Sequence, residues 1–280
     1  MKIAIFINNC PIQSALAYKI NDITSIDSIF ISHNIINSQF NNKSISYYFK
    51  RIVRVPFELP FRLAWNKLKA VYQNQHTILP SDIQQMMVDN INDLEVVEYI
   101  KKSKPKLIIV SATTMLKDEI INEANKIGCI ILNLHTGVSP YIKGGPNCTN
   151  WCLASNYYLI GNTIMTLDSG IDSGAIIATE LTILDGDESL FELHHKVFEH
   201  GFDLYTRVIS SIVKNEIKIK AIPQNDISIK GNLFYTKDWT IFKVIQSYFN
   251  FLFKYKNGIK SFKLNNNEKL FPFINKIEKK

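Results

Sequence analysis

The stretch KPKLIIVSATTMLKDEIINEANKIGCIILNLH, residues 104–135, indicates the fold class of this chain of 280 residues. Its two ends, 104–112 and 129–135, are short apolar runs of the kind that form buried strands. Between them, 116–128 has the periodicity of an amphipathic helix and closes on Gly128, a residue that commonly ends helices. Strand, helix and strand in this order predict a βαβ unit with two parallel strands.

The same alternation continues on both sides of this unit. Upstream, the patterns predict strands at 3–8 and 27–32 and helices around 14–20, at 62–72 and at 92–103. Downstream, they predict a helix at 147–155, two strands around a tight turn within 161–183, and a long helix at 187–213. We therefore expect an α/β fold, a Rossmann-like, doubly wound and mostly parallel sheet with a small C-terminal appendage.

The composition is that of a globular protein with a sizeable core, with 46% hydrophobic and 20% charged residues. Its length favours one large domain, residues 1–213, followed by a small extension, residues 214–280. Within the extension, 239–253 reads as an aromatic helix that is apolar on nearly all sides, which predicts burial in a core or in a dimer contact. The lysines from Lys254 onward add to the net charge of +7, and we favour a solvated surface over a phosphate-binding one.

Several classes of protein are disfavoured by the sequence. The four cysteines are scattered and include no zinc-binding set, so we expect reduced thiols. His194, His195, Glu199 and His200 follow no known metal motif and are interpreted as helix surface and packing, and no metal is expected. The apolar run at 3–7 is too short for a signal peptide or a membrane span, so a cytoplasmic location is expected.

The most informative polar residues follow the strand predicted at 129–135. Asn133 and His135 are two positions apart, so both point to the same side of that strand. A loop with Gly137, Pro140, Gly144 and Gly145 comes next and excludes a continuing strand or an ordinary helix. In open parallel sheets, ligands bind beyond the carboxyl ends of the strands, which is where this loop begins.

Asn133, His135 and a third residue, Asp172, form a plausible reaction site. The amide of Asn133 can donate to a developing oxyanion, and His135 can act as an acid or base near neutral pH. Asp172 sits in a glycine-bracketed turn, where its carboxylate would orient His135 and raise the pKa of the ring. Because the chain has no nucleophile elbow, the set suits acyl transfer between two bound substrates. Taken singly, Asn133 would more often form a turn and His135 would more often be a satisfied loop histidine.

These residues carry a resemblance to a known family. The pattern NLH…P…KGG…W, followed by GNTIMTLDSGIDSGAII at 161–177, resembles the 10-formyltetrahydrofolate-dependent formyltransferases. That family includes methionyl-tRNA formyltransferase, glycinamide ribonucleotide formyltransferase and the N-formyltransferases of nucleotide-linked amino sugars. Asn133, His135, Pro140, Gly144 and the run 170–174 match its pattern in order, and the resemblance is convincing over about residues 100–185.

The resemblance implies a mechanism and two ligand sites. The amine of the acceptor attacks the formyl carbon on N10 of the folate. Asn133 and protonated His135 stabilise the oxyanion, and Asp172 tunes His135 and helps to relay the proton. The resemblance places the folate against Thr113, Thr114, Met115, Leu116, Asp168, Gly170 and Ile171. It places the acceptor near Pro140, Lys143, Gly144, Gly145 and Asn147.

The acceptor is the less defined half of this prediction. The sequence departs from the family pattern at 136–139 and has Lys143 where the family has arginine, in the part of the loop that the acceptor approaches. With its short extension 214–280, the chain looks most like the sugar-nucleotide N-formyltransferases of surface-polysaccharide biosynthesis. We expect a nucleotide-linked amino sugar as acceptor, a homodimer, no membrane span and no nucleic acid. The extension would then serve dimerisation or acceptor binding. A methionyl-tRNA formyltransferase-like enzyme and a catalytically idle binding module are the alternatives.

Overall fold

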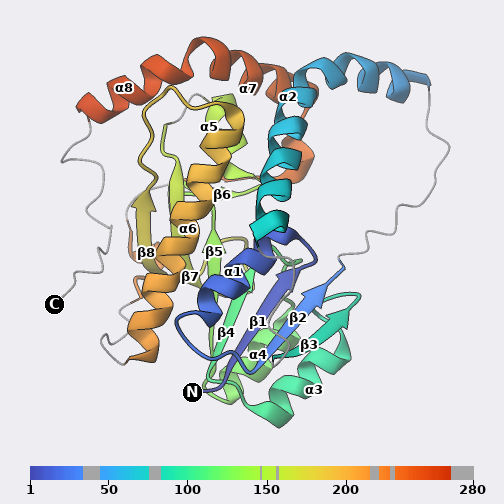
Figure 1. Ribbon diagram of the computed structural model, residues 1–280, viewed down its shortest axis with the longest axis vertical. Coiled ribbons are helices and arrows are strands. Elements are labelled where there is room, and N and C mark those ends of the chain that lie inside the picture. The colour runs from blue at the N-terminus through green and yellow to red at the C-terminus, as the bar shows by residue number, and fades with distance from the viewer. Residues whose placement is uncertain are drawn as a thin grey trace.

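A seven-stranded sheet lies at the centre of the molecule (Figure 1). The structure is a computed structural model that describes residues 1–33, 45–75, 83–145, 147–155, 158–214, 221–227 and 231–265. The order across the sheet is β3-β2-β1-β4-β5-β7-β8. The strands are β1 (Ile3–Asn8), β2 (Ser28–Ser32), β3 (Gln84–Val88), β4 (Leu107–Ser111), β5 (Ile130–His135), β7 (Gly161–Thr166) and β8 (Ile176–Leu181). A separate two-stranded sheet pairs β6 (Ile142–Gly144) with β9 (Asn232–Phe234).

The pairing of the strands confirms the predicted doubly wound arrangement. β1 pairs in parallel with β2 on one side and with β4 on the other, and β3 and β5 extend the sheet in parallel at the two flanks. β7 and β8 then continue it as an antiparallel hairpin beside β5. The strand order reverses between β1 and β4, so the carboxyl ends of β1, β4 and β5 border the crevice where ligands bind in such sheets.

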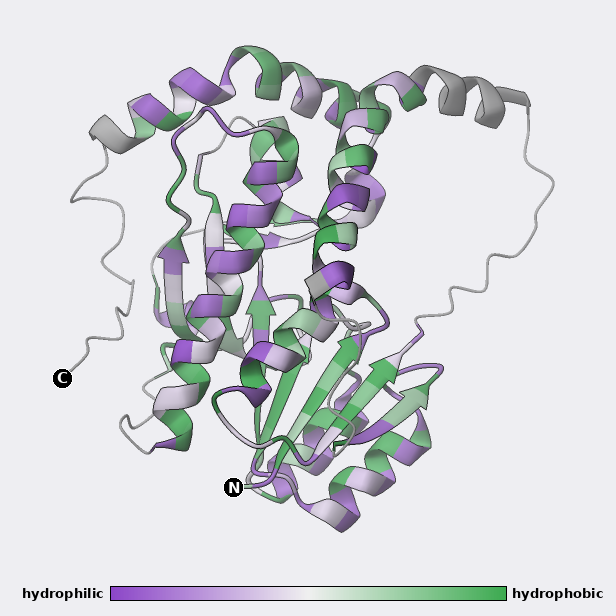
Figure 2. Ribbon diagram, in the orientation of Figure 1, coloured by the Kyte–Doolittle hydropathy of each residue, from purple (hydrophilic) through white to green (hydrophobic). Residues whose placement is uncertain are grey.

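Helices cover both faces of the sheet and bury it in two apolar layers. One layer joins the sheet to α1, α2 and α6, which Figure 1 shows on the viewer's side, and the other joins it to α3 and α4. Figure 2 shows that the central strands are hydrophobic along most of their length, as burial on both faces requires. The helices are α1 (Pro11–Asn21), α2 (Ile45–Gln75), α3 (Leu94–Ser103), α4 (Asp118–Lys126), α5 (Cys148–Ser155), α6 (Leu190–Val213), α7 (Ile241–Phe253) and α8 (Tyr255–Asn265), with short 3-10 turns at Gln224–Asp226 and Thr236–Asp238.

Besides β6, β9 and α8, for which no element was predicted, α2 and β3 differ from the sequence prediction. The helix expected at 62–72 is the last part of α2, which begins at Ile45 and contains Pro56 and Pro60. The earlier part of α2 was not predicted as helix, because its two prolines are unfavourable inside helices. The edge strand β3 was not predicted, because Gln84, Gln85 and Met87 are exposed and the segment lacks the apolar run of a buried strand.

The C-terminal extension packs against the rest of the chain. The aromatic helix expected at 239–253 is α7, which lies along α5 and α2. Asn250 of α7 donates from Nδ2 to the carbonyl of Leu153 in α5 at 2.8 Å. The expected burial holds for one face only, since Phe242 is 77% and Phe253 71% exposed. The contact of this helix with a second copy stays a prediction, and the lysines beyond residue 265 lie outside the described residues.

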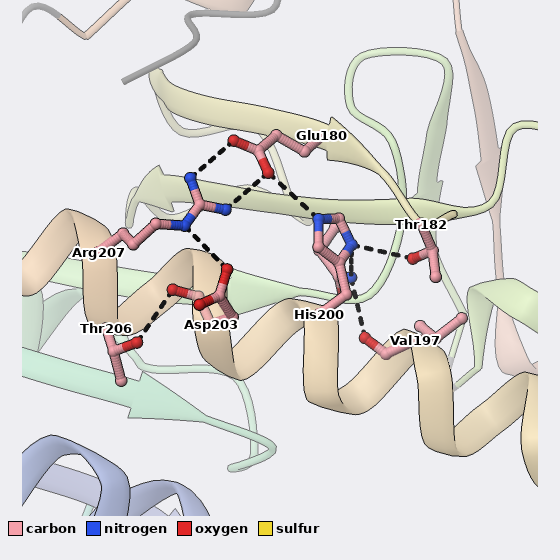
Figure 3. A network of polar contacts seen from close by, with 8 residues as sticks. Glu180, Thr182, Val197, His200, Asp203, Thr206 and Arg207 are labelled. Carbon is pink, nitrogen blue, oxygen red and sulfur yellow. Dashed lines mark hydrogen bonds and ion pairs between the residues drawn. The ribbon is translucent and has the colours of Figure 1, made fainter. Parts of the chain in front are cut away.

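A polar network fixes α6 to the β7–β8 hairpin (Figure 3). Arg207 donates to both carboxylate oxygens of Glu180 in β8, at 2.9 and 2.7 Å, and also binds Asp203 at 2.9 Å. Nε2 of His200 lies 3.2 Å from the same Glu180 carboxylate. Hydrogen bonds from His200 and Arg207 hold the pKa of Glu180 at about 2. Because the hairpin also carries the turn with Asp172, this network anchors one side of the candidate site.

Candidate active site

The candidate site begins at the carboxyl end of β5. Ile131 packs in the layer with α3 and α4, whereas Leu132 and Leu134 pack in the layer with α1, α2 and α6. By strand alternation, Asn133 and His135 share the face of Ile131. Asn133 is half-buried, and its side-chain amide has no hydrogen-bond partner in the part of the chain that the structure describes. The amide is therefore available to a ligand.

His135 is held at both ring nitrogens. Nδ1 lies 3.2 Å from the Asp172 carboxylate and Nε2 lies 3.0 Å from the carbonyl oxygen of Ile142. The ring is only 7% exposed. Burial by itself lowers the pKa of His135, but the neighbouring Cys148 sulfur and the Asp172 carboxylate raise it, and the net effect is a pKa of about 10. His135 is thus an imidazolium at neutral pH.

Cys148 at the start of α5 completes the surroundings of the ring. Its sulfur lies 3.6 Å from Nε2 of His135 and donates to the carbonyl of Gly144 at 3.0 Å. Burial raises the pKa of the Cys148 thiol, so the group is neutral near pH 7. Cys148 and Asp172 together raise the pKa of His135.

Asp172 links the turn after β7 to the loop after β5. Its backbone has a left-handed φ of 46°, which turns the carboxylate toward the loop. Besides facing His135, Oδ2 accepts a hydrogen bond from the backbone N–H of Gly144 at 2.8 Å. Gly144 has φ +70°, and a Cβ there would lie 2.2 Å from the carbonyl oxygen of Phe234 in β9. Glycine is required there because the backbone of the extension passes so close.

Gln224 holds the turn that carries Asp172. The sequence patterns did not predict this role. Its Nε2 donates to the carbonyls of Asp172 and Gly174, each at 2.8 Å. The side chain is 9% exposed, and its Oε1 is buried without a partner in the described part of the chain. An isolated glutamine 52 positions after Asp172 has no local pattern that would reveal this role.

The departure from the family pattern at 136–139 has a structural reason. A Cβ on Gly137 would lie 2.4 Å from Nε2 of His135, so the chain needs glycine beside the ring. Thr163 of β7 fixes this segment, since its hydroxyl donates to the carbonyl of Gly137 at 2.7 Å and accepts from the N–H of Ser139 at 3.0 Å. The variant loop is therefore anchored to the sheet rather than loosely attached.

The residues expected to contact a folate lie on the α3–α4 side. Leu116 is buried and Met115 is 60% exposed, and both follow β4. Asn92 secures this loop by accepting from the N–H of Lys117 at 2.7 Å and donating to the carbonyl of Met115 at 3.0 Å. Thr113 and Thr114 are half-buried. Leu116 and Leu167 pack in the same apolar layer, so this loop and the turn that follows Leu167 border one side of the site.

Within that turn, the expected contacts have different environments. Asp168 accepts from the N–H of Gly170 at 3.0 Å and from the hydroxyl of Ser173 at 2.5 Å, so its carboxylate shapes the turn itself. Ile171 is 39% exposed. The exposed side chains of Met115 and Ile171 supply apolar surface beside the site, whereas the role expected of Asp168 stays a prediction.

The residues expected to contact the acceptor are not all equivalent. Gly144 is joined to Asp172, whereas Pro140 is buried in the loop. Asn147 accepts from the N–H of Asn150 at 3.1 Å and so caps α5. Gly145 and Lys143 are half-buried, and Lys143 has no ion-pair partner in the ranges that the structure describes.

The described residues contain neither a metal-binding group of side chains nor a membrane-spanning helix. No group of three or more histidine, cysteine, aspartate or glutamate side chains there is arranged to hold a metal ion. His194 packs edge-on against Trp65, and His200 belongs to the network with Glu180. No helix in the same part of the chain has the length and apolar character needed to cross a membrane.

The fold and the site together define a doubly wound α/β protein with an amide, an imidazolium and a carboxylate at the crevice of its sheet. A family model described as formyl transferase matches residues 66–209, just over half of the chain. The chain belongs to the formyl transferase family, which confirms the resemblance seen in the sequence.

Relatives in sequence and in structure differ in their reported activities. The chain is 32% identical to methionyl-tRNA formyltransferase of Clostridium tetani over 127 residues, which are 45% of this chain and 40% of that protein. A 4-N formyltransferase of Francisella tularensis has a similar structure, with a TM-score of 0.55, 18% identity and coverage of 89% of this chain and 87% of that chain. An N-formyltransferase of Helicobacter canadensis, in complex with folinic acid and dTDP-3-aminofucose, has a TM-score of 0.53, 15% identity and coverage of 89% and 81%. The matching segment thus spans less than half of the methionyl-tRNA formyltransferase, and the structural likenesses establish the fold.

Proposed function

We propose that this protein transfers a formyl group from 10-formyltetrahydrofolate to the amine of a nucleotide-linked amino sugar, a step in surface-polysaccharide biosynthesis. The observation that carries the proposal is the contact of His135 Nδ1 with the Asp172 carboxylate at 3.2 Å, beside the unpartnered amide of Asn133. A free amide N–H₂ group and a positively charged ring lie on one face of a strand end. This pair suits the negative charge of the oxyanion in an acyl-transfer intermediate.

In this mechanism, the chain supplies charge and position rather than a nucleophile. The lone pair of the acceptor amine attacks the formyl carbon, and the new C–N bond converts the carbonyl oxygen into an oxyanion. The amide of Asn133 hydrogen-bonds this oxyanion, and the positive charge of the His135 ring stabilises it. When the intermediate collapses, the bond from the formyl carbon to N10 breaks, and the proton lost by the amine is relayed past Asp172 to N10. The products are a formamide and tetrahydrofolate.

The residues on the α3–α4 side fit the donor. Exposed Met115 and Ile171 offer apolar surface for a flat ring, and their neighbours Leu116 and Leu167 pack in the apolar layer of Ile131. Thr113 and Thr114 supply hydroxyl groups at the end of β4. We assign this side to the folate, with Asp168 and Gly170 shaping the turn that closes it.

Two observations bear on the acceptor. The fold shared with N-formyltransferases such as those of Francisella tularensis and Helicobacter canadensis extends over 89% of this chain, which supports a sugar-linked amine. The 32% identity with methionyl-tRNA formyltransferase keeps a transfer-RNA acceptor as the second candidate. A catalytically idle binding module is the third, and the retained contact of His135 with Asp172 argues against it.

A formyl-transfer screen tests the proposal. The full chain is incubated with 10-formyltetrahydrofolate and with dTDP-, UDP- or GDP-linked amino sugars, and initiator methionyl-tRNA serves as the rival acceptor. Mass spectrometry of the acceptor reports the added formyl group. We expect one amino sugar to be formylated, and Asn133→Ala to lower turnover by about 10²- to 10³-fold because one oxyanion donor is lost.

Asn125→Ala is the matched control, because Asn125 is an exposed asparagine on α4. Its turnover should stay within about twofold of the wild-type rate, since exposed surface substitutions rarely matter. Near-normal turnover of Asn133→Ala would contradict the mechanism. Formylation of methionyl-tRNA alone would assign the acceptor to the second candidate, and no transfer with any acceptor would favour the idle module.

A further inference from the structure

A pocket of about 330 Å³ lies between α2, α5, α6 and the segment that leads into α7. We call it the aromatic pocket because three of its lining residues carry aromatic rings. Its volume falls in the lower part of the range found for small-molecule sites. The rings belong to Phe61, Trp65 and Trp239, and three amide side chains, Asn66, Asn147 and Asn150, also line it.

His194 of α6 gives the aromatic pocket a buried polar group. The side chain is 2% exposed, and the ring of Trp65 meets it edge-on at 6.1 Å. Burial lowers the pKa of His194 to about 4, so the ring is neutral near pH 7. A neutral imidazole has one N–H donor and one acceptor nitrogen, and neither has a partner among the described residues. Because this ring lines the pocket, it suits a ligand that both donates and accepts hydrogen bonds.

Arg62 of α2 adds a positive charge at the edge of the pocket. Its side chain is exposed and has no ion-pair partner in the part of the chain that the structure describes. The neighbouring carboxylate of Glu58 is engaged by Arg54, with Nε and Oε1 2.5 Å apart. The Arg62 guanidinium therefore remains available for an anion, and its planar fork suits phosphate oxygens.

The aromatic pocket adjoins the candidate active site. Asn147 lines the pocket, and the next residue, Cys148, places its sulfur 3.6 Å from Nε2 of His135. The residue that lines the pocket and the residue beside the His135 ring are thus adjacent in the chain. The pocket is built from α2, α5 and α6, whereas the proposed folate surface lies toward α3 and α4. The two ligands would approach His135 from different sides.

We propose that the aromatic pocket binds the nucleoside phosphate end of the acceptor, with its base stacked on the indole rings and its phosphate on Arg62. Stacking on tryptophan suits the flat face of a base, and His194 with the three amides suits its edge, which carries both donors and acceptors. The location of the amine rests on the proposed function, whereas binding of a nucleoside phosphate does not. The same chemistry has two sources, a nucleoside diphosphate sugar and the 3′-terminal adenosine of transfer RNA.

Direct binding of nucleotides tests this proposal without catalysis. The full chain is titrated with UDP, dTDP, GDP and AMP, followed by calorimetry and by tryptophan fluorescence, since two of its three tryptophans line the pocket. We expect saturable binding that quenches fluorescence. Trp65→Ala should weaken it by about tenfold or more because a stacking surface is lost. Arg62→Gln, an exposed substitution that leaves the fold intact, should weaken a diphosphate more than the matching nucleoside.

Two variants serve as matched controls. Phe253→Ala removes an aromatic ring that is 71% exposed on α7, and Lys69→Gln removes a charge on α2, and neither residue lines the pocket. Both should bind nucleotide as the wild type does. Asn133→Ala should also bind nucleotide as the wild type does, because Asn133 does not line the aromatic pocket.

The outcomes separate this proposal from the proposed function. Binding that Trp65→Ala and Arg62→Gln both weaken supports the pocket even if no acceptor is formylated, in which case only the proposed function fails. A preference for AMP supports the pocket and assigns its ligand to transfer RNA. Absence of binding to every nucleotide, undiminished binding in both variants, or competitive displacement by folinic acid would overturn it.

Discussion

Two buried histidines, His135 in the candidate active site and His194 in the aromatic pocket, have opposite protonation states. They are 7% and 2% exposed, so burial alone would make both neutral. His135 faces the Cys148 sulfur and the Asp172 carboxylate, which raise its pKa. His194 faces the edge of Trp65 and no acceptor among the described residues, and its pKa falls to about 4.

The comparison shows that the partners of a buried ring decide its charge. The His135 ring can stabilise a developing anion, whereas the neutral His194 ring can donate and accept hydrogen bonds with an uncharged group. The same protein can therefore hold two chemically different ligand surfaces. The following three predictions test this contrast, and the largest expected effect comes first.

Asp172→Asn should have the largest effect, since it removes a carboxylate that raises the pKa of His135. The pKa of His135 then falls, and turnover at neutral pH should drop by about 10²- to 10³-fold. The pH at which activity is lost on the basic side should also move to lower values. A pH–rate profile measures the second effect, and NMR titration of the His135 ring measures the pKa without an acceptor.

The pH dependence of stability has a defined sign for His135. A histidine whose folded pKa is raised contributes stability that is complete below about 6.5 and is lost as the pH rises through the raised value. In Asp172→Asn, the free energy of unfolding should no longer decrease as the pH rises above about 6.5. An unchanged His135 titration in the variant would show that Asp172 does not set the charge of the ring.

His194 should show the opposite dependence, with a smaller effect. The pKa of His194 is about 4 in the folded protein and about 6.5 in the unfolded chain. Between these two pH values the ring is protonated in the unfolded chain only, which favours unfolding. We expect this group to cost about 2 to 3 kcal/mol of unfolding free energy between those values. Urea unfolding at several pH values should show that His194→Gln reduces the acid-dependent loss. His195→Gln, at the next position of α6, is the control and should not reduce it.

Gln224→Ala should have the smallest effect, because Gln224 positions Asp172 and touches no reacting group. Two hydrogen bonds to the turn are lost, each worth about 1 kcal/mol, and we expect turnover to fall about tenfold. The pKa of His135 should also fall, a change that general destabilisation would not produce. Gln13→Ala removes another buried glutamine, 4% exposed on α1, and should lower stability without moving that pKa. Equal effects of the two variants on the His135 titration would contradict a positioning role.

Sequence patterns predicted most of the sheet and the three central polar residues. Strand periodicity put Asn133 and His135 on one face, and the glycine-bracketed turn located Asp172 near them. The patterns missed β3, whose exposed side chains lack an apolar run, and the first part of α2. They also missed Gln224, because a contact across 52 positions between two isolated residues has no period to detect.

The sequence by itself determined the strand–helix alternation, the family and the face on which Asn133 and His135 lie, since backbone periodicity and short motifs are local properties. Only the tertiary structure decided which ring is charged, which residue holds the Asp172 turn, and that α2, α5 and α6 enclose a pocket beside His135. The physical reason is that desolvation, Coulomb interactions and cavity shape depend on distances in space, and folding brings together residues that no local pattern connects.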